Sequence, residues 1–212
     1  MSRFITFEGT EGCGKSTQLR LLADHLSRQG LQVCVTREPG GCPISDAIRQ
    51  ILLDPSSAGM DSKTELFLYA AARAQHLADV VRPALERGEV VLCDRFSDAT
   101  VAYQGYGRGL DIEQIEHLNR EATDGLVPDL TLLLDLPLET GLARAISRNS
   151  DSSEDEGRFE QEALAFHQRV RDGYLTLARS HDRFRVVPAD GDIDEVATRI
   201  RHAVAPWLGV TA

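Results

Sequence analysis

The residues best suited to chemistry lie in one short segment near the amino terminus. Residues 9–16 read GTEGCGKS and match the pattern G-x-x-x-x-G-K-[ST] without a mismatch. Three glycines let the backbone curl so that successive N–H groups face inward and bind phosphate oxygens, and a helix beginning near Lys15 adds the positive end of its dipole. In this pattern the lysine reaches the β- and γ-phosphates, and the Ser16 hydroxyl is placed to bind Mg²⁺. The segment therefore predicts a cradle for a polyphosphate.

A second group of polar residues follows a later apolar run. Residues 93–95 read CDR and come at the end of the run 90–93. Open α/β sheets bind ligands at the carboxyl ends of their strands, so Asp94 is the natural second ligand for magnesium. An alternative is that Asp94 caps the helix that follows. The fork-shaped cation of Arg95 beside it would suit a second phosphate.

These residues must be positioned by an alternation of apolar runs and helix-like segments. Such an alternation indicates an α/β fold with a parallel sheet, and runs that are apolar throughout indicate strands covered on both faces. Helices are expected where apolar residues recur at intervals of three to four. The five expected strands are residues 4–7, 33–36, 90–93, 130–136 and 184–187. The expected helices are residues 15–29, 44–53, 63–86, 112–122, 138–147, 160–180 and 194–207.

Length, charge and cysteine usage limit the class of protein further. The chain has 212 residues, which suits one domain over residues 1–212, and its formal net charge of −10 argues against nonspecific binding of nucleic acid. No basic stretch followed by an apolar one opens the chain, and no apolar run has membrane-spanning length, so we expect a cytoplasmic protein without a membrane partner. The four cysteines form no C-x-x-C pair and have no histidine at zinc-ligand spacing, which favours reduced structural thiols.

One polar segment interrupts two of the expected helices. Residues 149–157 read NSDSSEDEG, contain no apolar residue and cannot pack into a core. A solvated surface loop is one interpretation of this segment. The flanking Arg144, Arg148 and Arg158 favour the other, a mobile lid at about residues 147–160 that brings arginines to a phosphate.

A phosphate-binding loop of this kind occurs in nucleotide kinases, GTPase switches and motor-type ATPases. The sequence has no N-K-x-D tetrapeptide for guanine, and a larger ATPase would usually need a longer chain. Arg37, Arg73 and Arg95 lie outside the loop and could form a second anion pocket for a phosphoryl acceptor. A small nucleotide kinase is therefore the favoured class.

Several further motifs carry a resemblance to a known family. FEGTEGCGKST at 7–17, TREPGG at 36–41, DRF at 94–96 and AYQGYGRG at 102–109, with the arginine-flanked polar segment, occur in the order and spacing of bacterial thymidylate kinases. Over nearly its whole length the sequence resembles this family, of the type with arginines in the lid. The resemblance implies a P-loop nucleoside-monophosphate kinase fold with a five-stranded parallel sheet flanked by helices. It also implies a homodimer that transfers the γ-phosphoryl group of Mg-ATP to dTMP, giving dTDP and ADP for dTTP synthesis.

The resemblance implies roles for residues of the acceptor site. Tyr69 would stack on thymine and Arg73, on the same helix face, would bind a base carbonyl, whereas the competing aromatic Phe67 would pack in the core. Thr100 and Gln104 would meet the base edge, and Tyr103 would crowd the sugar 2′ position against ribonucleotides. The expected dTMP-binding residues are Glu11, Arg37, Pro39, Tyr69, Arg73, Arg95, Thr100, Tyr103 and Gln104.

The resemblance likewise implies donor-site and catalytic roles. Because the phosphate-binding loop carries Glu11 and no arginine, the additional catalytic cations would come from the lid. The expected ATP-binding residues are Gly9, Thr10, Glu11, Gly12, Cys13, Gly14, Lys15, Ser16, Thr17 and, against adenine, Arg144. The expected catalytic residues are Lys15, Asp94, Arg95, Arg148 and Arg158, and the expected Mg²⁺ ligands are Ser16 and Asp94.

The sequence departs from the family pattern at a few positions. Cys42 stands where TREPGG is followed by Thr, Ala99 where a Ser is common, and Tyr69 where Phe is usual. None of these changes removes a charge, so we expect them to alter packing. Two alternative functions stay open at this point: a kinase for another monophosphate such as dUMP, and a regulatory or scaffold protein that binds nucleotide without turnover.

Overall fold

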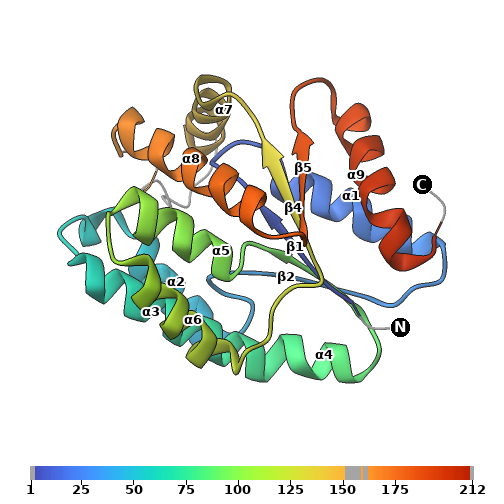
Figure 1. The fold of residues 1–212 in the computed structure, drawn as a ribbon, viewed down its shortest axis with the longest axis horizontal. Coiled ribbons are helices and arrows are strands. Elements are labelled where there is room, and N and C mark those ends of the chain that lie inside the picture. Colours follow the sequence, from blue (N-terminus) through green and yellow to red (C-terminus); the bar gives the residue numbers. More distant parts are fainter. Residues whose placement is uncertain (1–2, 151–158, 160–161, 211–212) are drawn as a thin grey trace.

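The fold is built on a parallel sheet, as the alternating pattern predicts. The computed structural model describes residues 3–150, 159 and 162–210, and within them a five-stranded sheet has the order β2-β3-β1-β4-β5 with every neighbouring pair parallel (Figure 1). Each expected strand is confirmed. The strands are β1 (Arg3–Glu8), β2 (Val33–Arg37), β3 (Val90–Asp94), β4 (Leu130–Asp135) and β5 (Phe184–Pro188).

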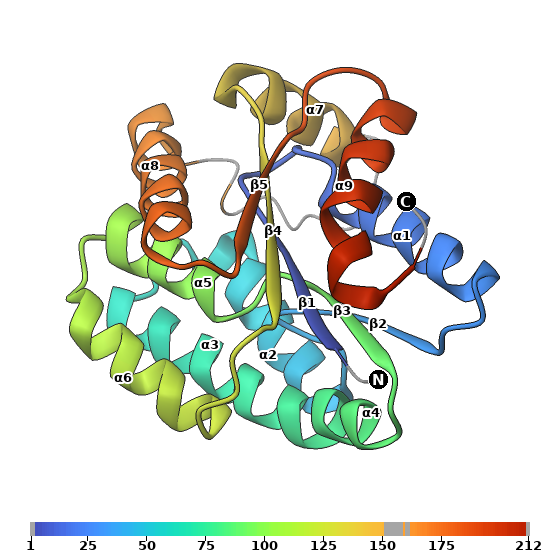
Figure 2. The ribbon, with the colours of Figure 1, turned by 45° about the vertical axis from the view of Figure 1, so that its right-hand side comes forward.

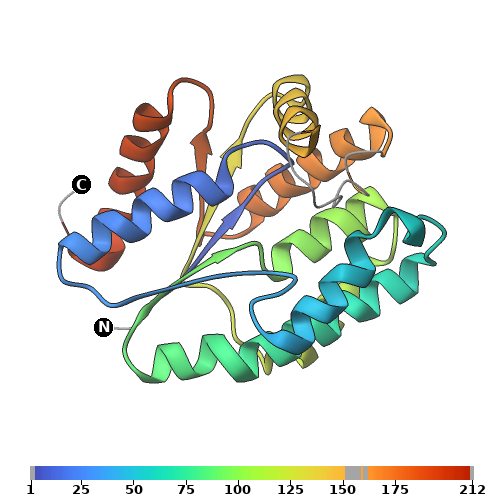
Figure 3. The same cartoon turned by 180° about the vertical axis from the view of Figure 1, so that it is seen from behind.

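Helices cover both faces of this sheet. Figure 2 shows α1 and α9 together on one face, and α3, α5, α6 and α8 on the other, which matches the contacts among them. Seen from behind in Figure 3, α1 runs beside α9 and α2 beside α3. The α-helices are α1 (Lys15–Arg28), α2 (Pro43–Leu53), α3 (Ser62–His76), α4 (Arg82–Glu86), α5 (Ser97–Thr100), α6 (Ile112–Thr123), α7 (Leu138–Ser150), α8 (Leu164–Ser180) and α9 (Ile193–Leu208).

Three shorter segments complete the helical structure. The expected helix over residues 63–86 is helical throughout, but the π-helical turn η2 (Leu77–Val81) separates α3 from α4. The expected helix at 160–180 begins only at Leu164, because Glu162 and Ala163 are not helical. The remaining segments are the 3₁₀ turn η1 (Pro55–Ser57) and the π-helical segment η3 (Val101–Gly107).

The helical run from Ser97 to Gly107, formed by α5 and η3, is absent from the sequence prediction. Its glycines have low intrinsic helix propensity, so the local pattern argues against a helix. Packing against α8 overrides that preference: a Cβ on Gly107 would lie 2.6 Å from the Phe166 ring, so only glycine allows this close approach. Long-range packing therefore determines an element that local propensity does not predict.

The apolar core lies on both faces of the sheet. One cluster places β1, β4 and β5 side chains against α1 and α9, and a second joins η3, α6 and α8 to β4 and β5. Strands β1, β3 and β4 are buried almost throughout, as expected for a sheet covered on both sides. Within the described part of the chain, no helix is long and apolar enough to cross a membrane.

Candidate active site

The predicted phosphate cradle follows β1 and leads into α1. Gly9, Gly12 and Gly14 have φ of 138°, 68° and 94°, values that L side chains rarely adopt, and α1 begins directly after Gly14. Within the loop, the Lys15 ammonium donates to the carbonyl oxygens of Gly9 at 3.1 Å and Thr10 at 2.9 Å. The strand-loop-helix arrangement that gives the motif its physical meaning is thus present.

The loop rests on the first turn of α7 through two glycines. A Cβ on Gly12 would lie 1.9 Å from the carbonyl oxygen of Gly141, and a Cβ on Gly141 would lie 2.6 Å from the carbonyl oxygen of Glu11. Backbone therefore packs directly on backbone at this point. Gly141 is outside every motif, and sequence reasoning did not single it out.

The two expected metal ligands lie side by side. Asp94 ends β3, which pairs with β1, and its Oδ2 accepts a hydrogen bond of 2.7 Å from the Ser16 hydroxyl at the start of α1. The alternative that Asp94 caps the next helix is wrong, because α5 begins at Ser97 with Phe96 at its N-cap position. Among the described residues no three His, Cys, Asp or Glu side chains cluster as a metal cage. One hydroxyl and one carboxylate fit Mg²⁺, which takes few protein ligands and completes its shell with phosphates and water.

A single cavity joins the cradle to the predicted acceptor residues. Its volume is about 490 Å³, a size suited to a small ligand. The predicted site residues that line it are Glu11, Gly12, Gly14, Lys15, Ser16, Thr17, Arg37, Pro39, Tyr69, Arg73, Asp94, Arg95, Thr100, Tyr103 and Gln104. Further lining residues that sequence reasoning missed are Arg20, Glu38, Arg49, Leu53, Phe96, Ala99 and Phe159.

Some predicted site residues are not brought to this cavity. Gly9, Thr10 and Cys13 belong to the loop but do not line the cavity, and Thr10 and Cys13 are buried. Arg144 is exposed on α7 and does not line the cavity. Arg158 and the side chain of Arg148 lie outside the described residues, as does most of the predicted lid at about 147–160.

Arg95 occupies a left-handed backbone conformation at the edge of the sheet, with φ of 69°. Its N–H donates to Phe7 O, and its guanidinium donates to Gly9 O at 3.0 Å and Glu11 Oε1 at 3.1 Å. The guanidinium also lies 4.8 Å above the centre of the Tyr103 ring, which adds a cation–π contact. These contacts fix the cation against the loop and overcome the cost of the unusual backbone.

Glu11 is ionised despite its burial. Burial raises the pKa of its carboxyl, but the nearby His167, Arg95, Lys15 and the Tyr103 hydroxyl together lower that pKa to about 2. Tyr103 donates to Glu11 Oε1 at 2.5 Å, and the His167 ring lies 3.4 Å from the other carboxyl oxygen. The negative charge of Glu11, a residue of the loop, therefore holds the Arg95 cation in place.

Glu8, at the end of β1, behaves in the opposite way. Burial and the neighbouring charge of Asp98 raise the pKa of its carboxyl to about 8, although Arg95 and two hydrogen bonds oppose this shift. The two bonds come from the Phe96 N–H at 2.8 Å and the Tyr174 hydroxyl at 2.7 Å. Glu8 therefore connects the strand that leads into the loop to the segment after β3.

Arg73 lines the cavity with only 2% of its surface exposed and is held by residues from several elements. Its Nε donates to Glu38 Oε2 at 2.8 Å, and its terminal nitrogens donate to Asn119 Oδ1, Thr100 Oγ1 and the Phe96 carbonyl. The guanidinium direction is thus fixed before any ligand arrives. Glu38 supplies the compensating charge that a buried cation requires.

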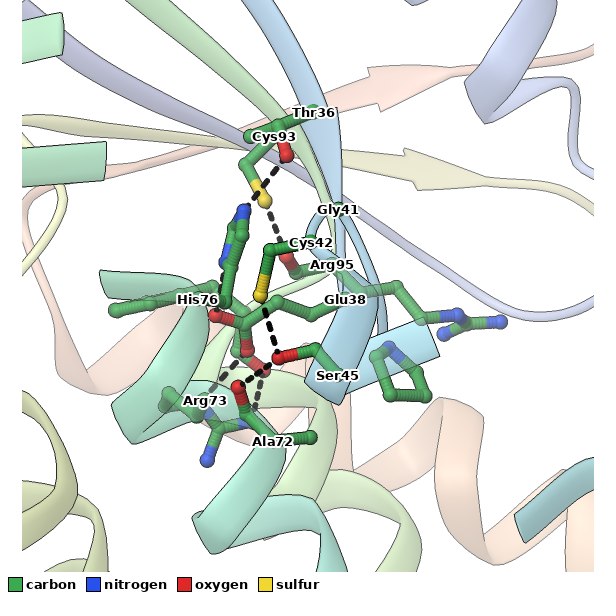
Figure 4. A network of polar contacts seen from close by, with 12 residues as sticks. Thr36, Glu38, Gly41, Cys42, Ser45, Ala72, Arg73, His76, Cys93 and Arg95 are labelled. Atoms are coloured by element: carbon green, nitrogen blue, oxygen red, sulfur yellow. Dashed lines mark hydrogen bonds and ion pairs between the residues drawn. The ribbon is translucent and has the colours of Figure 1, made fainter. Parts of the chain in front are cut away.

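The network continues beyond Glu38 to His76 and Thr36. His76 Nδ1 lies 2.9 Å from Glu38 Oε1, and because a carboxylate can only accept, this nitrogen carries the proton. The other ring nitrogen lies 2.6 Å from the Thr36 hydroxyl (Figure 4). Sequence reasoning missed Glu38 and His76, since an acid between Arg37 and Pro39 reads as an exposed turn residue and His76 belongs to no motif.

One aromatic prediction is wrong. Phe67 was expected in the core, but 58% of its surface is exposed on α3, because residue 67 faces away from the helices that cover the sheet. Tyr69 is half-buried and lines the cavity with Arg73. The four-residue spacing thus brings these two side chains to the same cavity, and their roles towards a base stay a prediction.

The parallel sheet, the glycine loop between β1 and α1, and the Ser16–Asp94 pair define a P-loop phosphotransferase of the nucleoside-monophosphate kinase fold. The family model described as thymidylate kinase matches residues 7–200. The chain belongs to the thymidylate kinase family.

Individual relatives agree with this assignment. A thymidylate kinase of Syntrophotalea carbinolica is 59% identical over 202 residues, which cover 94% of each chain. One of Geotalea uraniireducens is 57% identical over 210 residues, 98% of this chain and 99% of that one. The crystal structure of thymidylate kinase from Ehrlichia chaffeensis superposes with a TM-score of 0.78 at 32% identity and covers 96% of this chain and 98% of that one.

Proposed function

We propose that the chain is a dTMP kinase, which transfers the γ-phosphoryl group of ATP to dTMP and gives dTDP and ADP. The observation that carries the proposal is the single cavity in which the phosphate loop, the Ser16–Asp94 pair and Arg73 all meet. Donor phosphates on the loop and an acceptor against Arg73 would then be neighbours. Catalysis would consist of positioning and charge neutralisation. A phosphate monoester, with a second pKa of about 6, needs no general base to attack at neutral pH.

Mg²⁺ is the proposed cofactor, with Ser16 and Asp94 as its protein ligands. When bound, it would neutralise the phosphate oxygens of ATP during transfer. The 2.7 Å contact supports the assignment, because it brings together a hydroxyl and a carboxylate oxygen, the kind of ligands that Mg²⁺ takes from proteins. Lys15 would turn from the Gly9 and Thr10 carbonyls to the β- and γ-phosphates.

The acceptor would lie with its base between Tyr69 and the Arg73 network. Arg73 offers donors to a base carbonyl, while Thr100 and Gln104 line the same end of the cavity. Tyr103 is buried and rigidly bonded to Glu11, which suits exclusion of a 2′-hydroxyl. Arg95, Arg37 and Pro39 line the part that would hold the acceptor phosphate.

Further proposals rest on the sequence. We infer one domain over residues 1–212, with a lid at about 147–160 whose Arg148 and Arg158 act on the transferred phosphoryl group and whose Arg144 lies against adenine. Support comes from the polar composition of 149–157 and the arginines around it. Cytoplasmic localisation is proposed from the composition of the chain.

A homodimer is proposed from exposed apolar side chains on two helices that pack together. Ile44 and Ile51, seven residues apart on one face of α2, and Phe67 on α3 are each more than half exposed. A second copy of this chain would cover such a surface. Sedimentation should then report a dimer, and Phe67→Glu should shift it towards monomer.

A coupled assay of ADP release tests the function, with dTMP, dUMP, dCMP and AMP as acceptors and with Mg²⁺ replaced by EDTA as a control. We expect turnover that requires Mg²⁺ and is fastest with dTMP. Faster turnover with dUMP or AMP would assign another monophosphate kinase. Nucleotide binding without turnover of any acceptor would indicate the regulatory or scaffold alternative.

A further inference from the structure

Glu65 is a fully buried acid beside the acceptor end of the cavity. It lies in the first turn of α3 and has no exposed surface. Its Oε1 accepts a hydrogen bond of 2.9 Å from Nε2 of Gln104, a residue of η3 that lines the cavity and is itself buried. Glu65 does not line the cavity, so it could reach a ligand only through Gln104.

Arg108 keeps this carboxylate in place. Its Nε and Nη2 lie 3.2 and 3.3 Å from the two Glu65 oxygens. Arg108 is held in turn by Glu162 and lies 4.8 Å above the centre of the Phe166 ring. Both oxygens of Glu65 therefore accept from a fixed cation, and the carboxylate cannot turn away from Gln104 without losing these bonds.

The carboxylate decides which way the Gln104 amide faces. An amide has a donor end and an acceptor end, and an ionised carboxylate can bind only the donor end. The NH₂ group of Gln104 must therefore face Glu65, which leaves the carbonyl oxygen as the end that the cavity receives. Without Glu65, nothing in the chemistry of an amide would favour one orientation over the other.

Arg73 gives the same end of the cavity the opposite polarity. A guanidinium can only donate, and Arg73 also donates to Thr100, which precedes Gln104 by four residues in the same helical run. Arg73 lines the cavity, and its bonds to Glu38, Asn119, Phe96 and Thr100 leave one N–H on Nη1. This end of the cavity thus offers a donor from Arg73 and an acceptor from Gln104 to the edge of a base. A 4-oxo pyrimidine with a protonated N3 has the complementary pair, whereas a 4-amino pyrimidine has both groups reversed.

We propose that Glu65 is a positioning residue for base selection, which turns the Gln104 carbonyl towards the cavity and thereby favours 4-oxo over 4-amino pyrimidine monophosphates. This inference rests on the proposed function, because it assumes that the base of the acceptor lies at Gln104. It assigns the choice between the two classes of pyrimidine to a residue that touches neither.

The test compares kcat/KM for dTMP with kcat/KM for dCMP in the full-length protein. In Glu65→Gln only one of the two side-chain end groups can accept a hydrogen bond, so the Gln104 amide can present either its NH₂ group or its carbonyl oxygen to the cavity. We expect the ratio of the two kcat/KM values to fall at least tenfold, while KM for ATP changes less than twofold. The double variant Glu65→Gln with Gln104→Glu places an acceptor-only group at 104 and should recover most of the ratio. Glu162→Gln, which removes the other carboxylate charge beside Arg108 but does not contact Gln104, should leave the ratio unchanged.

The outcomes separate this inference from the function on which it rests. An equal loss for both acceptors, an unchanged ratio, or no recovery in the double variant would overturn the role of Glu65. If Glu65→Gln does not fold, Glu65→Asp retains the charge for Arg108 and withdraws the acceptor from Gln104, so the ratio should still fall. Absence of dTMP turnover in the unmodified chain would instead reject the proposed function.

Discussion

The Ser16 hydroxyl donates a 2.7 Å hydrogen bond to Oδ2 of Asp94 and so links the start of α1 to the end of β3. The two residues are distant in sequence, and the pairing of β1 with β3 brings them together. The two oxygens that we propose as Mg²⁺ ligands are therefore brought side by side by the pairing of β1 with β3. This preorganisation is the property that a magnesium site with few protein ligands requires.

Asp94→Asn should weaken the binding of Mg²⁺ and lower kcat by about a hundredfold, on the order of 3 kcal/mol in the barrier. The amide has the size of the carboxylate but no charge, so folding should survive. Activity measured against Mg²⁺ concentration checks the prediction. Asp24→Asn, at an exposed position on α1, is the matched control. An unchanged Mg²⁺ dependence would show that Asp94 does not bind the metal.

Lys15→Ala should reduce kcat by at least about a hundredfold, because it removes the cation that bridges the transferring phosphates. The variant also loses the bonds from the ammonium to the Gly9 and Thr10 carbonyls, so its thermal unfolding should be recorded beside its kinetics. Lys63→Ala, at the other lysine of the chain, is exposed on α3 and should behave as the unmodified protein. Near-normal turnover of Lys15→Ala would remove Lys15 from the catalytic residues.

Arg73→Ala should raise KM for dTMP strongly and leave KM for ATP almost unchanged. The structure adds a second consequence, because the substitution leaves the Glu38 carboxylate buried without its cation. Removing one partner of a buried ion pair costs about 3 kcal/mol or more of stability. Steady-state kinetics and urea unfolding measure the two effects separately, with Arg120→Ala on the exposed side of α6 as the control. Equal changes in both KM values would contradict the assignment of Arg73 to the base.

Stability should fall as pH rises through neutrality because of Glu8. The pKa of Glu8 is about 8 in the folded chain against an ordinary 4.5, so the folded state keeps a proton that the unfolded state releases. This contribution is complete below about pH 4.5 and is lost as pH approaches 8, with a slope of at most about 1.4 kcal/mol per pH unit. Glu8→Gln cannot titrate. The free energy of unfolding of the unmodified protein minus that of Glu8→Gln, measured from pH 5 to 9, should therefore fall as pH rises, and a constant difference would refute the prediction.

Cys42→Ser should stabilise the protein by about 0.5–1 kcal/mol. Cys42 is the N-cap residue of α2 in an extended conformation, and its side chain makes no cap hydrogen bond. A hydroxyl is a far better acceptor than a thiol for the free N–H groups of the first turn. Thermal unfolding should show a higher Tm for Cys42→Ser and an unchanged Tm for Cys34→Ser on β2. A lower Tm would mean that burial of the thiol against Ser45 contributes more than a cap.

The fold was predictable to the extent that its elements carry their own periodicity. The five strands are apolar runs and most helices repeat their apolar residues at regular intervals, so their positions follow from local sequence. The position of the run from Ser97 to Gly107 does not follow from local sequence, because Gly107 is required by its close contact with Phe166 on α8 and not by helix propensity. The prediction for Phe67 was wrong for a related reason. Helical spacing gives the direction of its side chain relative to that of Arg73, but it does not show which side of the helix is covered by other elements.

The residues of the candidate site likewise include some that the sequence predicts and some that it does not. The phosphate loop and Asp94 could be found because their chemistry requires fixed residue types at fixed spacing. Glu38 and Glu65 could not, because a buried acid is revealed only by the cation that faces it, and Arg73 and Arg108 come from other elements. Sequence patterns thus identify most of the residues that line the cavity, while the buried acids that hold their cations appear only in three dimensions.

The contact between Gly12 and Gly141 has a consequence for engineering. A phosphate loop transplanted into another scaffold would carry its own glycines but not the one on α7 that lets the loop lie flat, where any Cβ would come within 2.6 Å of the Glu11 carbonyl. The structural unit that has to be transferred is therefore larger than the sequence motif. It comprises the loop together with the first turn of α7, which lies far downstream in the sequence. Any graft or recombination of this segment has to transfer both pieces.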